Sequence, residues 1–401
     1  MLDKEKSINY NKASFRKGGY NMGLKKQLTT WEAACIITGY GIGGGILSMP
    51  YLSARIGFLN SLLVLLVAFA ASYILHLMIA DLALNVSDGG QIIACLGQFL
   101  FRGKLKKILT MSFFILMLAI LCTNLTGYIT GAEEILVELL PISNITAKLL
   151  FYLVAASVVL FGLKAVGVSE KIAMAVIYAL VAALAIASLV VGKNDVPMFS
   201  HDFTGCLAYY GMAMFSLAAF FSVPQAVEGL NGDKKRIKKA ILLGFLNNAI
   251  IIVIINFCAL LASDGVTSVA MIGWSKGIGL WAQIIGSLFT VLAMLTTYWS
   301  LSLALADLVE ETAGFSSRIS WVIATLPSLV LALFSIGNFM EFMRLAGGLI
   351  SIIIAVMIVP AFINARNEVE GSILRHNGKL VCALIIVSYV LMGIGNIVPV
   401  R

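Results

Sequence analysis

The sequence from Gly39 to Tyr51, GYGIGGGILSMPY, has glycine at five of its first seven positions. It lies in an apolar stretch, residues 31–57, that is long enough to cross a membrane as a helix. Unpaired backbone groups are costly in hydrocarbon, so an unwound segment is stable there only where protein, water or a ligand satisfies it. Glycine permits unwinding and close approach of a ligand. The run therefore predicts a broken membrane helix that forms a binding site, although small residues also allow two helices to pack tightly.

The composition is that of a chain that crosses a membrane many times. Of 401 residues, 60% are hydrophobic and 12% charged, and the mean hydropathy is +0.98, whereas soluble domains carry roughly a quarter charged residues. A membrane barrel would alternate apolar and polar residues, which this sequence does not do. The six cysteines stand singly and are expected to be small buried side chains. We predict an all-α membrane protein with about eleven helices, at residues 31–57, 59–84, 106–139, 147–163, 170–192, 206–229, 238–262, 278–309, 319–336, 343–363 and 380–397.

The distribution of positive charge predicts the orientation of the chain. Lys and Arg are retained on the cytoplasmic side of short loops. With the amino terminus inside, 22 of the 28 Lys and Arg residues fall in segments predicted to be cytoplasmic. We therefore expect a multi-pass protein of the cell (plasma) membrane with a basic cytoplasmic tail at residues 1–30. The run Lys234–Lys239 is attributed to topology, and no nucleic-acid partner is expected.

The two halves of the chain resemble one another at a nearly constant offset. Long segments at 106–139 and 278–309 correspond, and the glycine-rich break corresponds to Phe215–Phe220, which precedes Pro224. Interrupted segments at matching positions are typical of inverted-repeat transporters with a binding site at the midplane. Five helices per repeat force the second copy to run inverted. We expect a single transporter domain at 31–397, with repeats at about 31–192 and 206–363 and an additional helix at 380–397.

These segments resemble the amino acid/auxin permease family and the closely related tryptophan/tyrosine permeases, within the amino acid-polyamine-organocation superfamily. The signature Gly-x-Gly-Ile-Leu-x-x-Pro-Tyr matches Gly43–Tyr51, and an Ala-x-x-x-Gly-aromatic step matches Ala54–Phe58. The sixth-helix pattern of the relatives matches Ser216–Pro224, except that Phe220 replaces a histidine and makes the expected pocket more apolar. The resemblance implies a LeuT-type fold, with the substrate between the broken first and sixth helices and beside the third and eighth.

The resemblance also implies the residues of the substrate site. Free amides of the glycine run would bind the substrate carboxylate at the positive end of a half-helix. A tyrosine of the third helix would cover the substrate, although tyrosine at this depth also fits the interfacial aromatic belt. The predicted set is Gly43, Gly44 and Gly45 for the carboxylate, carbonyl groups near Thr38, Tyr40 and Phe215 for the amine, the covering residue Tyr128, and Ser216, Ala219 and Phe220 along the pocket.

In sodium-coupled members of this fold, two hydroxyl residues of the eighth helix and carbonyl groups of the broken first helix bind the ion. The matching residues are Thr296 and Thr297, with the carbonyls of Thr38 and Gly41, and such oxygen donors suit sodium. Hydroxyls of this kind can also bond only within their own helix. A proton-coupled mechanism needs an ionisable group at membrane depth. The available groups, each expected to have a structural role instead, are His76, Lys171, Glu133, Glu134, Asp307, Glu310 and Glu311.

A pocket without a buried charge suits an amino acid with an uncharged side chain. We therefore predict a secondary active transporter of small neutral or aromatic amino acids that works by alternating access, as a sodium-coupled symporter. A proton-coupled symporter and a transporter-like membrane sensor are the alternatives, and no cofactor is expected beyond a bound sodium ion. An enzyme is not expected, because an intramembrane metalloprotease needs a His-Glu-x-x-His helix, whereas His76, His201 and His376 are far apart.

Overall fold

The computed structural model describes residues 27–86, 90–266, 270–334, 339–366, 372–374 and 378–397. Every regular element in these ranges is a helix. In chain order the helices are α2 (Thr30–Gly41), α3 (Gly44–Ile56), α4 (Phe58–Leu84), α5 (Ile92–Phe99), α6 (Lys106–Leu139), α7 (Asn144–Leu160), α8 (Leu163–Val191), α9 (Phe203–Ser216), α10 (Ser222–Gly229), α11 (Lys234–Ala262), α12 (Ala270–Ile278), α13 (Leu280–Ala313), α14 (Ser317–Leu333), α15 (Phe339–Arg366) and α16 (Lys379–Ile397).

Long apolar helices form most of the bundle. Among the described residues, α4, α6, α8, α11, α13 and α16 are each long and apolar enough to cross a membrane. Their outer faces carry large apolar side chains, such as Leu66 at 66% exposure and Leu153 at 63%. Exposed apolar surface on this scale is unfavourable in water but suits contact with lipid. The predicted all-α membrane architecture is therefore confirmed.

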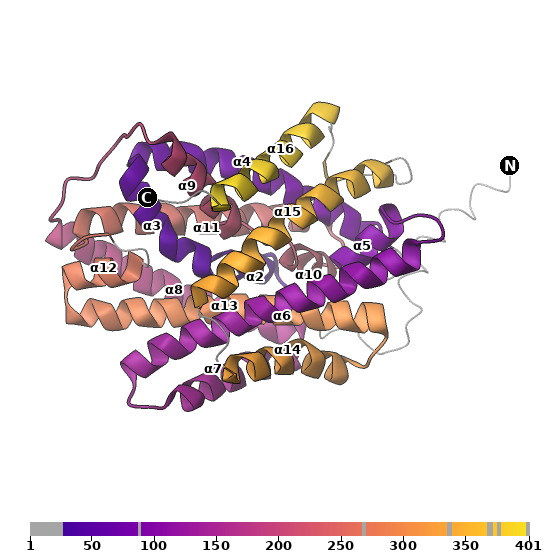
Figure 1. Cartoon of the computed structure of the whole chain (residues 1–401), viewed down its shortest axis with the longest axis horizontal. Coiled ribbons are helices and arrows are strands. Elements are labelled where there is room, and N and C mark those ends of the chain that lie inside the picture. The colour runs from indigo at the N-terminus through magenta and orange to yellow at the C-terminus, as the bar shows by residue number, and fades with distance from the viewer. Residues whose placement is uncertain are drawn as a thin grey trace.

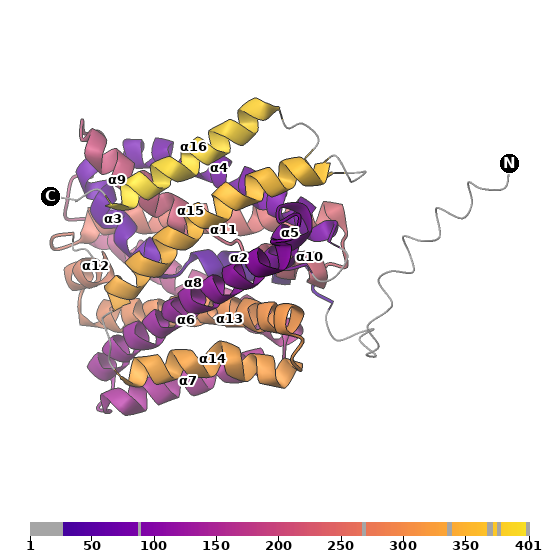
Figure 2. The same cartoon turned by 45° about the vertical axis from the view of Figure 1, so that its right-hand side comes forward.

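The helices are layered around a central first helix (Figures 1 and 2). Helices α6 and α13 run across the bundle together, with α7 and α14 packed along one edge of them and α16 on α9 and α15 at the opposite edge. Helix α2 lies in the interior against α8, α11 and α13. Two short helices that the sequence did not predict, α5 and α12, lie at opposite ends of the bundle. At eight and nine residues they are too short to span a membrane.

Two segments are broken at the positions that the sequence predicts. The first is divided into α2 and α3 at Ile42 and Gly43, and the second into α9 and α10 at residues 217–221. The Ile42 amide still donates to the Thr38 carbonyl at 3.0 Å, which closes the last turn of α2. Pro224 stands in the first turn of α10, where a backbone amide has no acceptor within the helix. Both breaks therefore follow from the backbone properties of particular residues.

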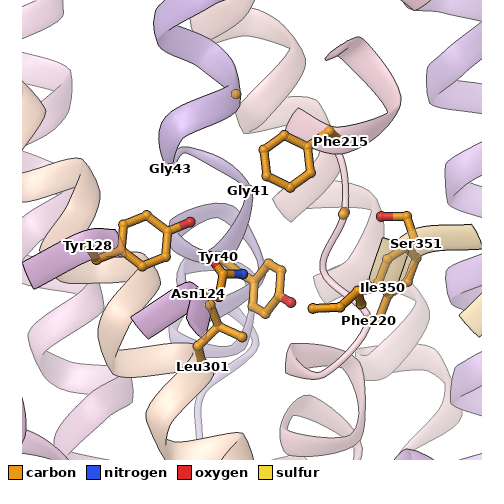
Figure 3. A pocket seen from close by; sticks show the side chains of 12 residues that line it. Tyr40, Gly41, Gly43, Asn124, Tyr128, Phe215, Phe220, Leu301, Ile350 and Ser351 are labelled. Atoms are coloured by element: carbon orange, nitrogen blue, oxygen red, sulfur yellow. The ribbon is translucent and has the colours of Figure 1, made fainter. Parts of the chain in front are cut away.

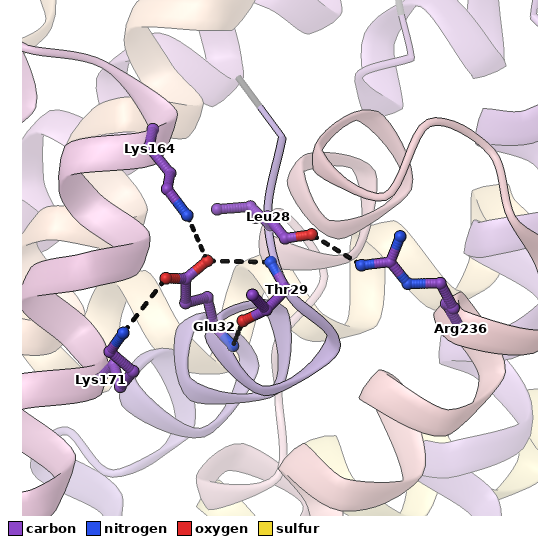
Figure 4. Close-up of polar contacts among 6 residues, drawn as sticks. All are labelled: Leu28, Thr29, Glu32, Lys164, Lys171 and Arg236. Carbon is purple, nitrogen blue, oxygen red and sulfur yellow. Dashed lines mark hydrogen bonds and ion pairs between the residues drawn. The ribbon is translucent and has the colours of Figure 1, made fainter. Parts of the chain in front are cut away.

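The start of α8 differs from the prediction. The charges of Lys164 and Lys171 suggest a loop and a helix that begins near residue 170, but α8 begins at Leu163. Both lysines extend from its first turns toward Glu32 of α2, at 2.6 and 3.3 Å (Figure 4). Long lysine side chains can lie along a helix while the ammonium reaches a polar partner. Glu170 is consequently about two turns inside α8.

The segments predicted to be cytoplasmic meet at one end of the bundle. Arg236, at the start of α11, donates to the Leu28 carbonyl at 2.8 Å and to the Thr30 hydroxyl at 3.2 Å, beside the lysines that hold Glu32 (Figure 4). We call these ion pairs and hydrogen bonds of Glu32, Lys164, Lys171 and Arg236 the α2 anchor. Residues 1–26 of the predicted tail lie outside the described residues. Its cytoplasmic orientation and the repeat boundaries stay predictions.

Candidate functional site

The glycines of the first break let neighbouring helices touch its backbone. A Cβ at Gly41 would lie 2.1 Å from Asn248 Nδ2 of α11. A Cβ at Gly43 would lie 2.7 Å from the Tyr128 hydroxyl of α6 and 2.8 Å from Thr297 Oγ1 of α13. Cβ contacts below 3.0 Å are essentially never observed. Close packing against three helices therefore favours glycine at these positions, independently of any ligand.

The amino-terminal end of α3 faces the second break. Helix α3 begins directly after Gly43, so its first amides have no acceptor within the helix and carry the positive end of its dipole. Gly45 lies against Ser216 at the end of α9, where a Cβ would be 2.4 Å from the serine hydroxyl oxygen. That hydroxyl is buried and has no hydrogen-bond partner among the described residues. Figure 3 shows Phe215 beside this junction. The two breaks are thus in direct contact.

A cavity lies where the breaks meet (Figure 3). It contains about 380 Å³ of unfilled space, counting the part that opens to solvent. Helices α6, α13 and α15 complete its wall around the broken pair. The lining residues are Tyr40, Gly41, Gly43, Gly45, Asn124, Tyr128, Phe215, Ala218, Phe220, Leu301, Ile350 and Ser351.

Six of the nine predicted substrate-binding residues line this cavity: Tyr40, Gly43, Gly45, Tyr128, Phe215 and Phe220. Gly41, predicted for the sodium site, lines it as well. Gly44 is the first residue of α3. Ser216 and Ala219 stand behind the wall, where Ser216 packs on Gly45 and the Ala219 amide bonds to His76. Most of the predicted set is therefore brought together at the cavity, with Ser216 and Ala219 behind its wall.

Sequence reasoning missed five lining residues: Asn124, Ala218, Leu301, Ile350 and Ser351. Asn124 could have been found, because it is four residues before Tyr128 and so shares its helix face. Its side-chain oxygen is buried and has no hydrogen-bond partner among the described residues. Ile350 and Ser351 have no local signal, since only the packing of α15 brings them to the cavity.

The two predicted hydroxyl residues of the eighth helix meet the first break. Thr297 Oγ1 donates to the Gly39 carbonyl at 2.9 Å, and Thr296 Oγ1 reaches the same oxygen at 3.3 Å. Each hydroxyl also lies 3.0 Å from the Ala293 carbonyl one turn earlier in α13. The predicted carbonyl of Thr38, one residue before Gly39, accepts the hydrogen bond of the Ile42 amide within α2. The structure therefore brings the two predicted threonines together at the Gly39 carbonyl and not at that of Thr38. We call these hydroxyl and carbonyl groups the oxygen cluster.

A buried carboxylate stands beside this cluster and is absent from the predicted candidates. Glu170 of α8 has no exposed surface. Its Oε1 accepts a hydrogen bond of 2.9 Å from Ser300 of α13, one turn beyond the two threonines. Its Oε2 lies 2.1 Å from the place that a Cβ of Gly39 would occupy. The sequence prediction began this helix at residue 170, which made Glu170 look like a charge at a helix end. The apolar residues from Leu163 onward could have indicated that the helix begins earlier.

His76 holds the second break in place. The side chain is fully buried in α4, and its Nε2 accepts a hydrogen bond from the Ala219 amide at 2.8 Å. Its Nδ1 lies 2.6 Å from the Ser72 carbonyl, to which only a protonated nitrogen can donate, so the ring is neutral with its proton on Nδ1. The ring also stacks on Phe220 with centroids 4.9 Å apart. His76 thus satisfies a backbone group that the break exposes.

The remaining predicted ionisable candidates lie toward the helix ends. Glu134 and Glu310 are exposed. The others have these contacts: Lys171 with Glu32 at 3.3 Å, Glu133 with Lys148 at 3.4 Å and with Asn144, Asp307 with the Gln91 side chain at 3.4 Å, and Glu311 with the Gln91 amide at 3.3 Å. Each of these contacts joins neighbouring segments of the fold. They do not reach the cavity lining.

Two broken helices around a central cavity, supported by long apolar helices, define a membrane transporter of the LeuT type. The fold is similar to that of Mhp1, a nucleobase-cation-symport-1 family transporter solved in a closed conformation with bromovinylhydantoin bound. The TM-score is 0.64 at 14% identity, over 93% of this chain and 92% of that one. It is also similar to MhsT in complex with L-phenylalanine, with a TM-score of 0.63 at 17% identity over 93% of this chain and all of that one (100%).

The chain belongs to the tryptophan/tyrosine permease family, whose model matches residues 26–396. It is 27% identical over 368 residues to the tyrosine-specific transport system 1 of Haemophilus influenzae, which covers 84% of this chain and 88% of that protein. The family resemblance and the LeuT-type fold inferred from the sequence are confirmed. Because the family consists of transporters, the protein is a permease and not an enzyme.

Proposed function

We propose that this protein is a secondary active symporter that carries aromatic amino acids across the cell membrane by alternating access. The observation on which the proposal depends is the cavity between the two helix breaks. It combines the amino-terminal end of α3, which has no side-chain cap and whose dipole favours a carboxylate, with a wall in which no described lining residue carries a charge. Such a site suits an amino acid whose side chain is uncharged.

The shape of the wall supports an aromatic side chain. Four rings, those of Tyr40, Tyr128, Phe215 and Phe220, surround the cavity with Leu301 and Ile350 (Figure 3). Aromatic rings attract one another in offset or edge-to-face contacts. The similarity to a tyrosine-specific transport system and to a structure that holds L-phenylalanine supports the same substrate class. Within the small, branched and aromatic side chains that the sequence leaves open, the aromatic class is therefore proposed.

A monovalent cation is proposed to move with the substrate. The proposed sodium ligands are the hydroxyls of Thr296 and Thr297 with the carbonyls of Thr38 and Gly41. A proton is the second candidate cation, and one observation favours it. The sequence favours sodium because it indicates no buried ionisable group near the site. Glu170 is a buried ionisable group near the site, and it could take up a proton.

Alternating access requires that the two ends of the cavity open in turn. The α2 anchor ties the start of the broken first helix to α8 and α11 (Figure 4). We propose that this end faces the cytoplasm, as the distribution of Lys and Arg predicts, and that the α2 anchor separates when the site opens inward. The lysine side chains of these ion pairs are partly exposed, whereas the Glu32 side chain is buried, so the lysines can separate from it toward solvent.

Uptake by purified protein in liposomes tests the proposal. Labelled L-tyrosine should accumulate under an inward gradient of sodium or of protons, applied separately. Unlabelled phenylalanine and tryptophan should compete strongly, whereas alanine and lysine should compete weakly. Equal competition by alanine would contradict the aromatic assignment. A folded protein that binds tyrosine but moves none would instead support the sensor alternative.

A further inference from the structure

The Glu170 carboxylate is completely enclosed by protein. Its relative exposure is 0%, and it lies between α2, α8 and α13. One oxygen accepts the hydrogen bond of Ser300, whose hydroxyl also lies 3.4 Å from the Ile36 carbonyl of α2. The other oxygen, Oε2, has no hydrogen-bond partner among the described residues. One of the two carboxylate oxygens is thus left without a hydrogen bond.

The positive charges on the elements packed against α8 are directed elsewhere. Lys171, the next residue in the chain, turns to Glu32 (Figure 4). Among the other cations, Lys164 pairs with Glu32, Lys148 pairs with Glu133, Arg236 donates to Leu28 and Thr30, and Lys276 is exposed. Among the acidic groups, Asp307 and Glu311 accept hydrogen bonds from Gln91, and Glu228 lies near Glu311. The Cys35 thiol is buried in α2. None of the described cations pairs with Glu170.

A buried carboxylate without a counter-charge is not stable as an anion. Moving such an ion from water into a low-dielectric interior is strongly unfavourable, even after the surrounding protein relaxes. The group must therefore bind a cation or take up a proton. Ionisable groups that occur at membrane depth are characteristically those that bind or relay ions. An external cation would supply the one positive charge that Glu170 lacks.

The position of Glu170 links this charge to the broken helix. Its Oε2 lies against Gly39, whose carbonyl is the one reached by Thr296 and Thr297. Two residues later, Gly41 lines the substrate cavity. A charge added or removed at Glu170 therefore acts on the last turn of α2, directly before the break. This helix is also the one that the α2 anchor holds at its other end.

We propose that Glu170 is the residue that binds the coupling cation, a single positive charge delivered as Na⁺ or H⁺, and that its neutralisation permits the movement of α2. The inference rests on the proposed symport function. It goes beyond that function by naming a carboxylate of α8, to which Ser300 donates a hydrogen bond, as the group that makes transport depend on a gradient. The sodium form places the ion between Oε2 and the oxygen cluster of α13, whereas the proton form converts the carboxylate to a neutral acid.

Glu170→Gln tests this inference because the amide is neutral, nearly isosteric and permanently equivalent to the neutralised form. In liposomes, wild-type protein should accumulate labelled L-tyrosine above equilibrium under a sodium or a proton gradient, and the effective gradient identifies the cation. The variant should lose accumulation under both gradients. It should still exchange labelled for unlabelled tyrosine at a rate within about threefold of wild type, since the packing is conserved. Glu138→Gln, at an exposed carboxylate of α6, is the matched control and should accumulate tyrosine normally.

A second measurement does not depend on transport. A cation that binds only the folded protein raises its thermal stability by linkage. The Tm of detergent-purified protein should therefore rise with sodium at constant pH, or with acidification at constant sodium, and Glu170→Gln should remove that dependence. Glu170→Asp keeps the charge and should retain a dependence with altered affinity, which separates loss of the charge from loss of the fold.

The outcomes distinguish the inference from the function on which it rests. Gradient-driven accumulation by Glu170→Gln at the wild-type level, or an unchanged cation dependence of its Tm, would overturn the role of Glu170. Failure of wild-type protein to move any aromatic amino acid would overturn the proposed function instead. In that case the Tm series still decides whether Glu170 binds a cation.

Discussion

Two glutamates on the α2–α8 interface have opposite surroundings. Glu32, in the first turn of α2, is held by the ammonium groups of Lys164 and Lys171 and by the Thr29 amide (Figure 4). Glu170, deeper in α8, contacts the neutral Ser300 and has one oxygen without a partner. The same side chain is therefore a neutralised structural contact at one level of the bundle and an uncompensated charge at another.

The difference indicates how a buried charge can be interpreted. A carboxylate that is paired with partly exposed lysines joins two helices by contacts that can separate and reform at low cost. A carboxylate that is enclosed without a counter-charge is destabilising as it stands, so its presence needs an additional ligand. The first arrangement suits a gate, and the second suits a cation site. Substitutions that alter one glutamate and spare the other should separate the two roles.

The largest effect is expected from Gly39→Ala. The added Cβ would lie 2.1 Å from Glu170 Oε2 and 2.8 Å from its Cδ, inside a fully buried contact between α2 and α8. One of the two groups must shift, which moves either the carboxylate or the last turn of α2. We expect gradient-driven tyrosine uptake to fall by roughly a hundredfold, because the overpacking costs about 1–3 kcal/mol or more and displaces the site. Initial rates of uptake in liposomes measure the effect.

Gly97→Ala is the matched control for this substitution. Its Cβ would lie 3.5 Å from the Thr110 hydroxyl oxygen, which is an ordinary contact. Uptake by this variant should stay close to that of wild type. Normal uptake by Gly39→Ala would show that the close approach of α2 to Glu170 is not needed for transport.

Much of the fold could be predicted because its decisive features are local. The first break follows from glycines that alone tolerate the contacts at Gly41 and Gly43, and Pro224 marks the start of α10 after the second break. Long apolar segments fix the spanning helices by length and composition. Helices α5 and α12 were missed because segments of eight and nine residues produce no spanning signal.

The site could be predicted only where it lies on the broken helices. Residues beside the breaks, such as Tyr40 and Phe215, line the cavity as expected. Ile350 and Ser351 reach it through the tertiary packing of α15, which no local pattern reveals. The prediction of a buried Glu170 depended on where its helix begins, and helix boundaries are the least reliable part of a sequence interpretation. An error of seven residues changed a buried carboxylate into an apparent terminal charge.

A smaller effect is expected from Ser300→Ala. This change removes the hydrogen bond of 2.9 Å that the serine donates to the Glu170 carboxylate. A bond to an ionised group stabilises the anion by about 1.5–3 kcal/mol, so its loss should make the carboxylate bind a proton at least roughly tenfold more tightly. The affinity for sodium should change less, because the carboxylate stays ionised when sodium is bound. The half-saturating sodium or proton concentration for tyrosine uptake measures the change.

Ser302→Ala provides the comparison for Ser300→Ala. The Ser302 hydroxyl is equally buried, but it bonds at 2.6 Å to the Tyr298 carbonyl of its own helix. This variant should keep the wild-type cation affinity. The same shift in both variants would assign the effect to the packing of α13 and not to Glu170.

The smallest effect is expected at the other glutamate. Lys164→Gln removes one of the two ion pairs of Glu32, and the lysine side chain is 38% exposed. Partly exposed pairs contribute about 0.2–1 kcal/mol, so the open state of this end should become roughly two- to fivefold more populated. Cys35, buried in α2 beyond Glu32, reports the opening. With the other five cysteines replaced, its labelling by a membrane-permeant maleimide should accelerate by that factor.

Arg55→Gln separates this effect from a general loss of stability. Arg55 pairs with Asp202 at 3.6 Å between α3 and α9, away from the α2 anchor, and its side chain is similarly exposed at 29%. Its loss should leave the labelling of Cys35 unchanged. Equal acceleration in both variants would mean that the label reports overall loosening. Acceleration in Lys164→Gln alone, with its cation affinity unchanged, would show that Glu32 controls access while Glu170 controls coupling.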